Sequence, residues 1–147
     1  MTPSTLTDEF AALLDLEHRE AFLRSNQIDI DGRTVSIHCE GIGDDANVLI
    51  YTTCPPPLPW QKAAVHQLLL EANFLWVGTA GATFGISPNS GQILLSARLP
   101  LALFTAEGAR AVMHNIARLA DFWMDACARL TEPDDTDQSE QRHLIAC

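Results

Sequence analysis

The sequence predicts an α+β fold, with helices packed on one face of a twisted antiparallel sheet. Three stretches carry apolar residues at helical spacing, and the segments between them contain short β-branched and apolar runs that end at turn residues. The dipeptide Asp31-Gly32 stands between two alternating runs, which is a strong signal for a two-residue hairpin and therefore for antiparallel pairing. The expected order is helix, three strands, helix, two strands, helix.

The chain length of 147 residues suits one domain with one hydrophobic core. Residues 1–130 are expected to form that domain. Residues 131–147 contain five acidic residues and one arginine, so we expect them to form a flexible acidic tail.

The first helix is expected to run from about Asp8 to Arg24, with Thr7 as its N-cap and acidic residues in its first turn. Its apolar residues form a stripe that is broader than packing on one core requires. The residues of this stripe are Phe10, Leu13, Leu14, Leu16, Ala21, Phe22 and Leu23.

Strands are expected on both sides of Asp31-Gly32, within "QIDIDGRTVSIHCE", and again at Val48–Thr53. In the second strand Val35 and Ile37 share one face, because alternate residues of a strand point to the same side. The prolines at 55–57 lack the N–H that a ladder requires, so they end the third strand.

A second helix is expected from Trp60 to Phe74 or Leu75, followed by strands in "GATFGIS" and "QILLSARL" that are joined by a turn at 89–91. Pro100 ends the last of these strands. The final helix is expected from Ala106 to Leu130, where apolar residues recur at a spacing typical of an amphipathic helix.

The formal net charge is −10, which disfavours nucleic acid and anionic membranes as partners because both need a cationic surface. No segment is apolar for long enough to predict a membrane span. The N-terminal stretch has no basic region ahead of an apolar run, so no secretory signal is expected and the expected location is the cytoplasm.

The four cysteines and five histidines show no spacing typical of a metal or redox site. The spacing of the glycines at 78, 81 and 85 matches neither GxGxxG nor GxxxxGK[ST], the two common nucleotide-binding motifs. A phosphate-binding loop also leads into a helix, whereas a strand is expected after these glycines. No serine lies in a GxSxG context. The sequence therefore predicts no catalytic residue, no metal ligand, no cofactor and no enzymatic activity.

The segment "LLLEANFLWVGTAGATFGISPNSGQILLSARLPL", residues 68–101, has no charged residue between Glu71 and Arg98. A helix and hairpin this apolar exceed what a two-layer domain needs on a single face, which indicates a subunit interface. The residues expected at a symmetric dimer interface are Leu68, Leu69, Ala72, Phe74 and Trp76.

The same segment resembles the central part of the type III secretion chaperones of the CesT/Tir-chaperone family, the class I effector chaperones. The shared pattern is a leucine run, Glu-Ala-Asn, Gly-Ala-Thr, two apolar strands around a turn, and Leu-Pro-Leu. In this chain the pattern falls at Leu68–Leu70, Glu71–Asn73, Gly81–Thr83, Phe84–Ile86, Asn89–Gly91, Ile93–Leu95 and Leu99–Leu101. The triple proline at 55–57 and the bulky Trp76 depart from it.

The resemblance implies a homodimer that binds the N-terminal segment of a secreted effector in an extended form and keeps it soluble and competent for secretion. It implies no nucleotide or metal, and it makes the ATPase of the secretion apparatus a further candidate partner. The residues alone leave two other functions open, a small-molecule-binding or enzymatic α+β domain and a regulatory or structural dimer.

The effector surface is expected on the first helix and the first three strands, where apolar residues exceed the needs of the core outside the dimer interface. One face of the strands is expected to cover the helices, and the other to leave an apolar patch beside a sheet edge. An extended effector segment could add a strand at that edge. The residues expected to contact the effector are Leu13, Leu16, Phe22, Ile28, Ile30, Val35 and Ile37.

Overall fold

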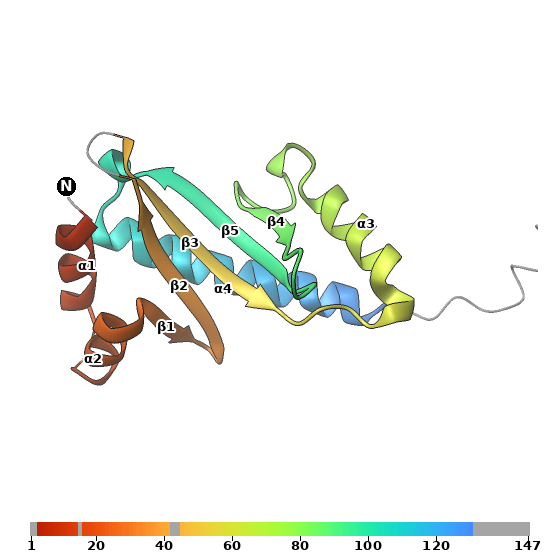
Figure 1. Ribbon diagram of the computed structural model, residues 1–147, viewed down its shortest axis with the longest axis horizontal. Coiled ribbons are helices and arrows are strands. Elements are labelled where there is room, and N and C mark those ends of the chain that lie inside the picture. Colours follow the sequence, from red (N-terminus) through yellow and green to blue (C-terminus); the bar gives the residue numbers. More distant parts are fainter. Residues whose placement is uncertain (1–2, 15, 42–44, 131–147) are drawn as a thin grey trace, which may run out of the picture.

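The computed structural model describes residues 3–14, 16–41 and 45–130 (Figure 1), so the predicted tail at 131–147 lies outside the described residues. The α-helices are α1 (Pro3–Ala12), α2 (Leu16–Ser25), α3 (Lys62–Ala72) and α4 (Ala106–Ala128). The strands are β1 (Gln27–Ile30), β2 (Arg33–Glu40), β3 (Asn47–Cys54), β4 (Thr83–Ile86) and β5 (Ile93–Pro100). Short 3-10 turns are η2 (Pro59–Gln61), η3 (Phe74–Trp76) and η4 (Leu101–Leu103).

The strands form one antiparallel sheet in the order β1-β2-β3-β5-β4, which confirms the predicted α+β class. The β1–β2 hairpin turns at Asp31 and Gly32, whose φ angles are 52° and 84°. Both angles lie in the left-handed region that a two-residue turn of type I′ requires. The resulting register places Ile28 opposite Val35.

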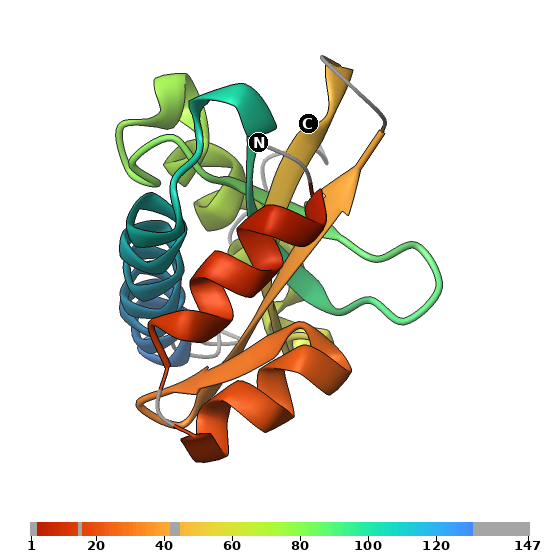
Figure 2. The ribbon, with the colours of Figure 1, turned by 90° about the vertical axis from the view of Figure 1, so that its left-hand side faces the viewer.

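Helix α4 crosses one face of the sheet, and α1 lies beside α4 at one end of the molecule (Figures 1 and 2). Strand residues that face α4 are buried, as shown by Val48, Ile50 and Thr52 of β3, while the residues between them are more exposed. Helix α3 lies at the end of the molecule opposite α1 and α2 (Figure 1).

The single first helix predicted over Asp8–Arg24 is wrong, because α1 ends at Ala12 and α2 begins at Leu16. Helix α1 also begins at Pro3, so Thr7 lies inside it and is not the N-cap.

The break between α1 and α2 allows two phenylalanines to meet in the core. The ring centroids of Phe10 and Phe22 are 4.8 Å apart, and both side chains are buried. In one straight helix, residues twelve positions apart are separated by about 18 Å along the axis. Arg19 supports the break because its Nε donates to the carbonyl oxygen of Ala11 at 2.8 Å and its Nη2 donates to that of Leu14 at 3.2 Å.

Helix α3 is shorter than the sequence predicted, because η2 precedes it and η3 follows it. The φ angles of Leu75 and Trp76 are 51° and 54°, and a right-handed helix cannot continue through two left-handed residues. The chain then turns back into β4. The last helix, α4, begins at Ala106 as predicted, and its N-cap is Thr105, whose side chain accepts from the Gly108 N–H.

Candidate binding surfaces

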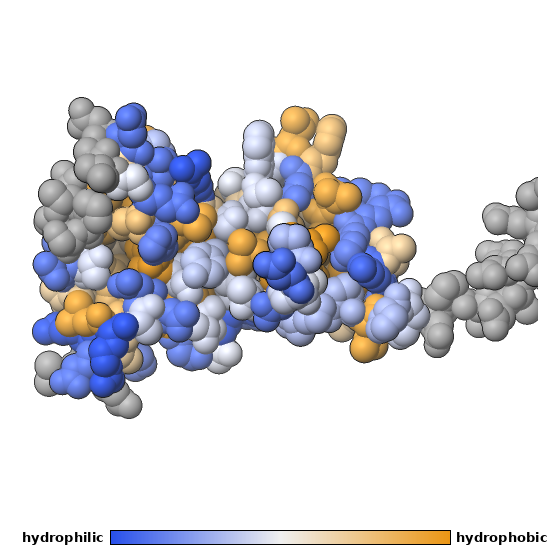
Figure 3. Space-filling model, in the orientation of Figure 1, coloured by the Kyte–Doolittle hydropathy of each residue, from blue (hydrophilic) through white to orange (hydrophobic). Residues whose placement is uncertain are grey.

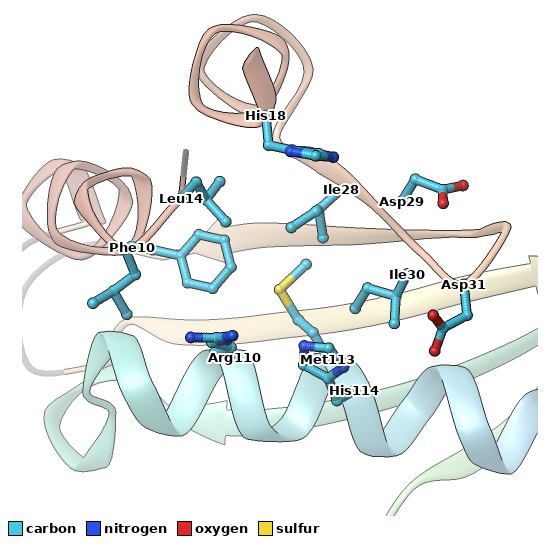
Figure 4. Close-up of a pocket in the computed structure, with 11 residues that line it drawn as sticks. Phe10, Leu14, His18, Ile28, Asp29, Ile30, Asp31, Arg110, Met113 and His114 are labelled. Atoms are coloured by element: carbon cyan, nitrogen blue, oxygen red, sulfur yellow. The ribbon is translucent and has the colours of Figure 1, made fainter. Parts of the chain in front are cut away.

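A pocket of about 260 Å³ opens between α1, α2, β1 and α4 (Figure 4). We call it the N-terminal pocket. It is lined by Phe10, Leu13, Leu14, His18, Ile28, Asp29, Ile30, Asp31, Arg110, Met113 and His114.

The inner part of the N-terminal pocket is apolar. Phe10 of α1, Ile30 of β1 and Met113 of α4 are buried there. Ile28 is half-buried, and Leu13 is 39% exposed. The pocket therefore offers apolar contacts from three elements to a side chain that enters it.

The rim of the N-terminal pocket carries charged and titratable groups. Arg110 and His114 lie four residues apart on α4, and His18 of α2 lies on the opposite side (Figure 4). Among the described residues, Arg110 has no hydrogen-bond or ion-pair partner. Asp29 and Asp31 stand at the β1 end, where Asp29 Oδ1 accepts from the Gly32 N–H at 2.9 Å. A ligand with an apolar group in the pocket would therefore have Arg110 near one flank of that group and the carboxylates of Asp29 and Asp31 near another.

Only some of the predicted effector-binding residues reach the N-terminal pocket. Leu13, Ile28 and Ile30 line it. The side chain of Leu16 lies outside the described side chains. Sequence reasoning missed Arg110 and Met113, although their three-residue spacing on the last helix places them on one side of it.

The expectation of an exposed apolar patch is wrong for Phe22, Val35 and Ile37, because all three side chains are buried. Val35 and Ile37 belong to the core cluster, and α4 packs on β2. The apolar side of the β1–β2 hairpin therefore faces the core. Phe22 is buried against Phe10.

A second candidate surface surrounds the end of α3. Apolar side chains gather there on the face drawn in Figure 3. We call it the α3–η3 apolar surface. Its members and their exposed fractions are Leu70 (69%), Phe74 (72%), Leu75 (68%), Trp76 (56%) and Val77 (84%). Large apolar side chains this exposed and this close in sequence are typical of an interaction site.

The five residues predicted for the dimer interface fall into two groups. Phe74 and Trp76 belong to the α3–η3 apolar surface, and Leu68 is half-buried. Leu69 and Ala72 are only 3% and 4% exposed, so they pack inside their own chain and are not available to a second subunit. Their burial follows from the helical period, because they lie on the side of α3 that faces the core.

The described cysteines have thiols that burial keeps protonated. Burial raises the pKa of the thiols of Cys39, Cys54 and Cys127, which keeps them protonated and weakly nucleophilic. No cluster of three or more metal-ligating side chains occurs among the described residues. Within the same part of the chain, no helix has the length and apolar character needed to cross a membrane.

Comparison with known proteins gives one family match. The model of the family described as "Tir chaperone protein (CesT) family" matches residues 5–124. No curated protein matches the chain significantly.

Solved structures share the fold. A chain in the crystal structure of the ExsC-ExsE complex is 20% identical, with a TM-score of 0.58 over 84% of this chain and 94% of that one. A chain in the structure of the HopA1-SchA chaperone-effector complex is 15% identical, with a TM-score of 0.52 over 83% of this chain and 90% of that one.

Proposed function

The chain belongs to the Tir chaperone protein (CesT) family, and from this premise we propose that it is a type III secretion chaperone that binds an effector's N-terminal segment in an extended form. It acts in the cytoplasm, before secretion, and keeps that segment soluble. The family match over residues 5–124 carries this proposal. The fold shared with a chain of the HopA1-SchA chaperone-effector complex supports it.

The N-terminal pocket is the proposed anchor site for the effector. It lies beside β1, which is an edge strand of the sheet. An extended segment can pair with an edge strand through its backbone and place alternate side chains on one face. One apolar side chain would enter the pocket and contact Leu13 and Ile28.

The charged groups on the rim of the pocket favour particular charges in the effector residues next to the anchor. An acidic effector residue beside the anchor would pair with Arg110, which has no partner among the described residues. A basic residue on the other side would meet Asp31, which is exposed. Each such exposed pair contributes roughly 0.2–1 kcal/mol, so the apolar anchor supplies most of the affinity.

The α3–η3 apolar surface is the proposed homodimer interface. A C₂ interface brings the same patch of both subunits together, so each exposed residue of the patch becomes buried in both subunits. Burial of one large apolar side chain contributes roughly 1.5–3 kcal/mol. Several such side chains on each subunit would therefore support a stable dimer.

Titration calorimetry tests the effector site. The ligand is the N-terminal fragment of a secreted protein that co-purifies with the chain. Leu13→Asp and Ile28→Asp should each weaken binding by at least about tenfold, since each removes an anchor contact worth roughly 1.4 kcal/mol or more. The matched control is Leu23→Asp, because Leu23 of α2 is half exposed but does not line the pocket.

The control should bind like the wild-type protein. Equal affinity for all four proteins, with folding confirmed by circular dichroism, would place the effector site elsewhere. Equal losses in all three variants would indicate a general charge effect and would also contradict the pocket as the anchor site.

A further inference from the structure

The backbone groups at the free edge of β1 are arranged around one residue, Asp29. The Ile37 N–H donates to the Asn26 carbonyl oxygen at 2.9 Å, so these two residues form a hydrogen-bonded pair directly beside the β1–β2 ladder. In an antiparallel ladder such pairs alternate with pairs whose backbone groups point outward. The N–H and C=O groups of Ile28 and Ile30 therefore point toward β2, and those of Asp29 point toward the free edge.

Gln27 also faces the free edge, but its N–H is already used. It donates to Ser25 Oγ at 3.3 Å. Asp29 therefore offers an added strand both a donor and an acceptor, whereas Gln27 offers its carbonyl oxygen. An added strand that uses both groups of Asp29 has one residue directly opposite it. The backbone of Asp29 thus fixes the register in which a segment can join this edge.

The side chains of β1 alternate between the pocket and the opposite face of the sheet. Ile28 and Ile30 line the N-terminal pocket and point toward α4, whereas the Asp29 side chain points away from α4 (Figure 4). Side chains that lie directly opposite each other on paired strands share a face. Two residues of the added segment would therefore face the pocket, and the residue between them would lie beside the Asp29 carboxylate.

The surroundings of this carboxylate are acidic. Asp29 is exposed, and its Oδ1 is held in place because it accepts from the backbone of the β1–β2 turn at 2.9 Å. Its cross-strand neighbour, Thr34, is neutral, and Asp31 adds a second exposed carboxylate two residues away. The guanidinium of Arg33 is engaged elsewhere, because its Nε donates to Asp121 Oδ1 of α4 at 2.7 Å. A cation from a bound segment would therefore be favoured beside Asp29, and an anion disfavoured.

We propose that the segment that joins β1 carries a lysine or arginine between two apolar residues, and that this cation pairs with Asp29. The inference rests on the proposed effector site and names the class of segment that this site selects. The apolar residue opposite Ile28 is the anchor in the N-terminal pocket, and the apolar residue opposite Ile30 lies on the same face. The anchors supply most of the affinity, and Asp29 determines which segments are accepted.

Selection from a phage-displayed peptide library tests the proposal on the full chain. Every library member contains the core Leu-X-Leu, in which X is any amino acid, with random residues on both sides. Lysine or arginine should be enriched at X. Synthetic peptides with lysine, glutamine or glutamate at X are then titrated by fluorescence anisotropy. The lysine peptide should bind roughly two- to fivefold more tightly than the glutamine peptide, and the glutamate peptide should bind most weakly.

Asp29→Asn is the decisive variant, because asparagine keeps an oxygen that can accept from the turn but carries no charge. Its affinities for the lysine and glutamine peptides should differ by less than about 1.5-fold. Asp125→Asn is the matched control, since it removes the same charge from an exposed residue near the end of α4. It should keep the preference of the wild-type chain. Asp29→Arg should reverse the preference in favour of glutamate.

The outcomes separate this inference from the effector site on which it rests. Leu13→Asp should weaken all three peptides alike, because it removes an anchor contact and leaves Asp29 in place. Peptides that depend on Leu13 but bind equally whatever stands at X would overturn the inference alone, and so would a lysine preference that persists in Asp29→Asn. Failure of the wild-type chain to enrich any Leu-X-Leu peptide would overturn both the site and the inference.

Discussion

The side chain of Asn73 pairs with the backbone of Phe84 as a neighbouring strand would. The Phe84 N–H donates to Asn73 Oδ1 at 2.8 Å, and Asn73 Nδ2 donates to the Phe84 carbonyl oxygen at 3.1 Å. Strand β4 lies at the edge of the sheet and has β5 as its strand partner. One amide at the end of α3 thus satisfies the outer edge of β4 at this position and fixes α3 against the sheet.

Asn73→Ala should therefore lower the free energy of unfolding by about 2 kcal/mol, since two hydrogen bonds of about 1 kcal/mol each are lost in a half-buried site. Urea unfolding followed by circular dichroism measures the change. Gln67→Ala is the control because the Gln67 amide also donates a hydrogen bond, from Nε2 to Glu71 Oε1, but in an exposed position. It should change stability by less than about 0.5 kcal/mol. Equal effects would contradict a structural role for the Asn73 pairing.

Gly78 is fixed by close packing rather than by its backbone angles. A Cβ at this position would lie 2.9 Å from the Ala72 carbonyl oxygen and 3.0 Å from Trp123 Cζ2. Trp123 is held there because its Nε1 donates to the Gly78 carbonyl oxygen at 2.9 Å. The hydrogen bond and the close packing between Gly78 and Trp123 therefore hold the loop after η3 against α4.

Gly78→Ala should destabilise the protein by roughly 1–3 kcal/mol through overpacking. Thermal melting with matched urea unfolding measures the loss. Gly85→Ala provides the comparison, because nothing lies within 4 Å of a Cβ built at Gly85. It should leave the melting temperature close to that of the wild-type protein. A harmless Gly78→Ala would mean that the Trp123 contact can shift freely.

Stability should fall in alkaline solution because of the buried thiols. Burial raises the pKa of Cys54 above the ordinary thiol value of 9.0, and the hydrogen bond from Arg33 only partly opposes this. Below pH 9.0 the thiol of Cys54 keeps its proton in both the folded and the unfolded chain, so its ionisation does not lower the free energy of unfolding. Above it the unfolded thiol ionises first, and the free energy of unfolding falls as pH rises. Urea unfolding at a series of pH values above 8 should show this decline.

In Cys54→Ala the free energy of unfolding should fall less steeply as the pH rises above 8, whatever the effect of the substitution on stability at neutral pH. The neighbouring buried thiol of Cys127, whose pKa is also raised by burial, should keep part of the decline. A decline of unchanged slope in Cys54→Ala would show that other groups cause it.

Local chemistry explains which parts of the fold were predictable. The Asp31-Gly32 turn needs two left-handed residues, and this pair of residue types supplies them without help from the rest of the chain. The break between α1 and α2 has no such local cause. It depends on contact between Phe10 and Phe22 and on carbonyl oxygens that Arg19 reaches from the second helix. The spacing of apolar residues along one segment predicts neither the Phe10–Phe22 contact nor the hydrogen bonds of Arg19.

The N-terminal pocket was predictable only in part, for the same reason. Alternation along β2 shows that Val35 and Ile37 share a face, but it does not show which face α4 will cover. The sequence therefore predicted both residues on the exposed face, whereas they are buried. Met113 and Arg110 come from the last helix, and only tertiary packing brings that helix opposite β1.

Removal of residues 131–147 should leave the folded domain intact. These residues are rich in acids and contain few apolar side chains. The last residue before them, Leu130, is half-buried and packs against the core, so the end of α4 is held without them. A chain that ends at Leu130 should melt within a few degrees of the full chain. A larger fall would show that Leu144 or Ile145 contributes to the core.

The proposed dimer predicts opposite outcomes for the same substitution at Leu69 of α3 and at Phe74 of η3. Phe74→Arg places a charge in the α3–η3 apolar surface, where the side chain is exposed in the single chain. The subunit should still fold, but an unpaired charge buried at the interface costs several kcal/mol. Leu69→Arg places the same charge in the core of the subunit, so it should prevent folding rather than dissociate a folded dimer.

Light scattering coupled to gel filtration at micromolar concentration measures the assembly, and circular dichroism measures the fold. The wild-type chain should be a dimer and Phe74→Arg a folded monomer. Leu103→Arg is the control, because Leu103 is equally apolar and highly exposed but lies in η4, at the α1 end of the sheet (Figure 1). It should remain dimeric, since it lies outside the proposed two-fold contact. A wild-type monomer, or a Phe74→Arg dimer, would show that the α3–η3 apolar surface covers something other than a second copy of the chain.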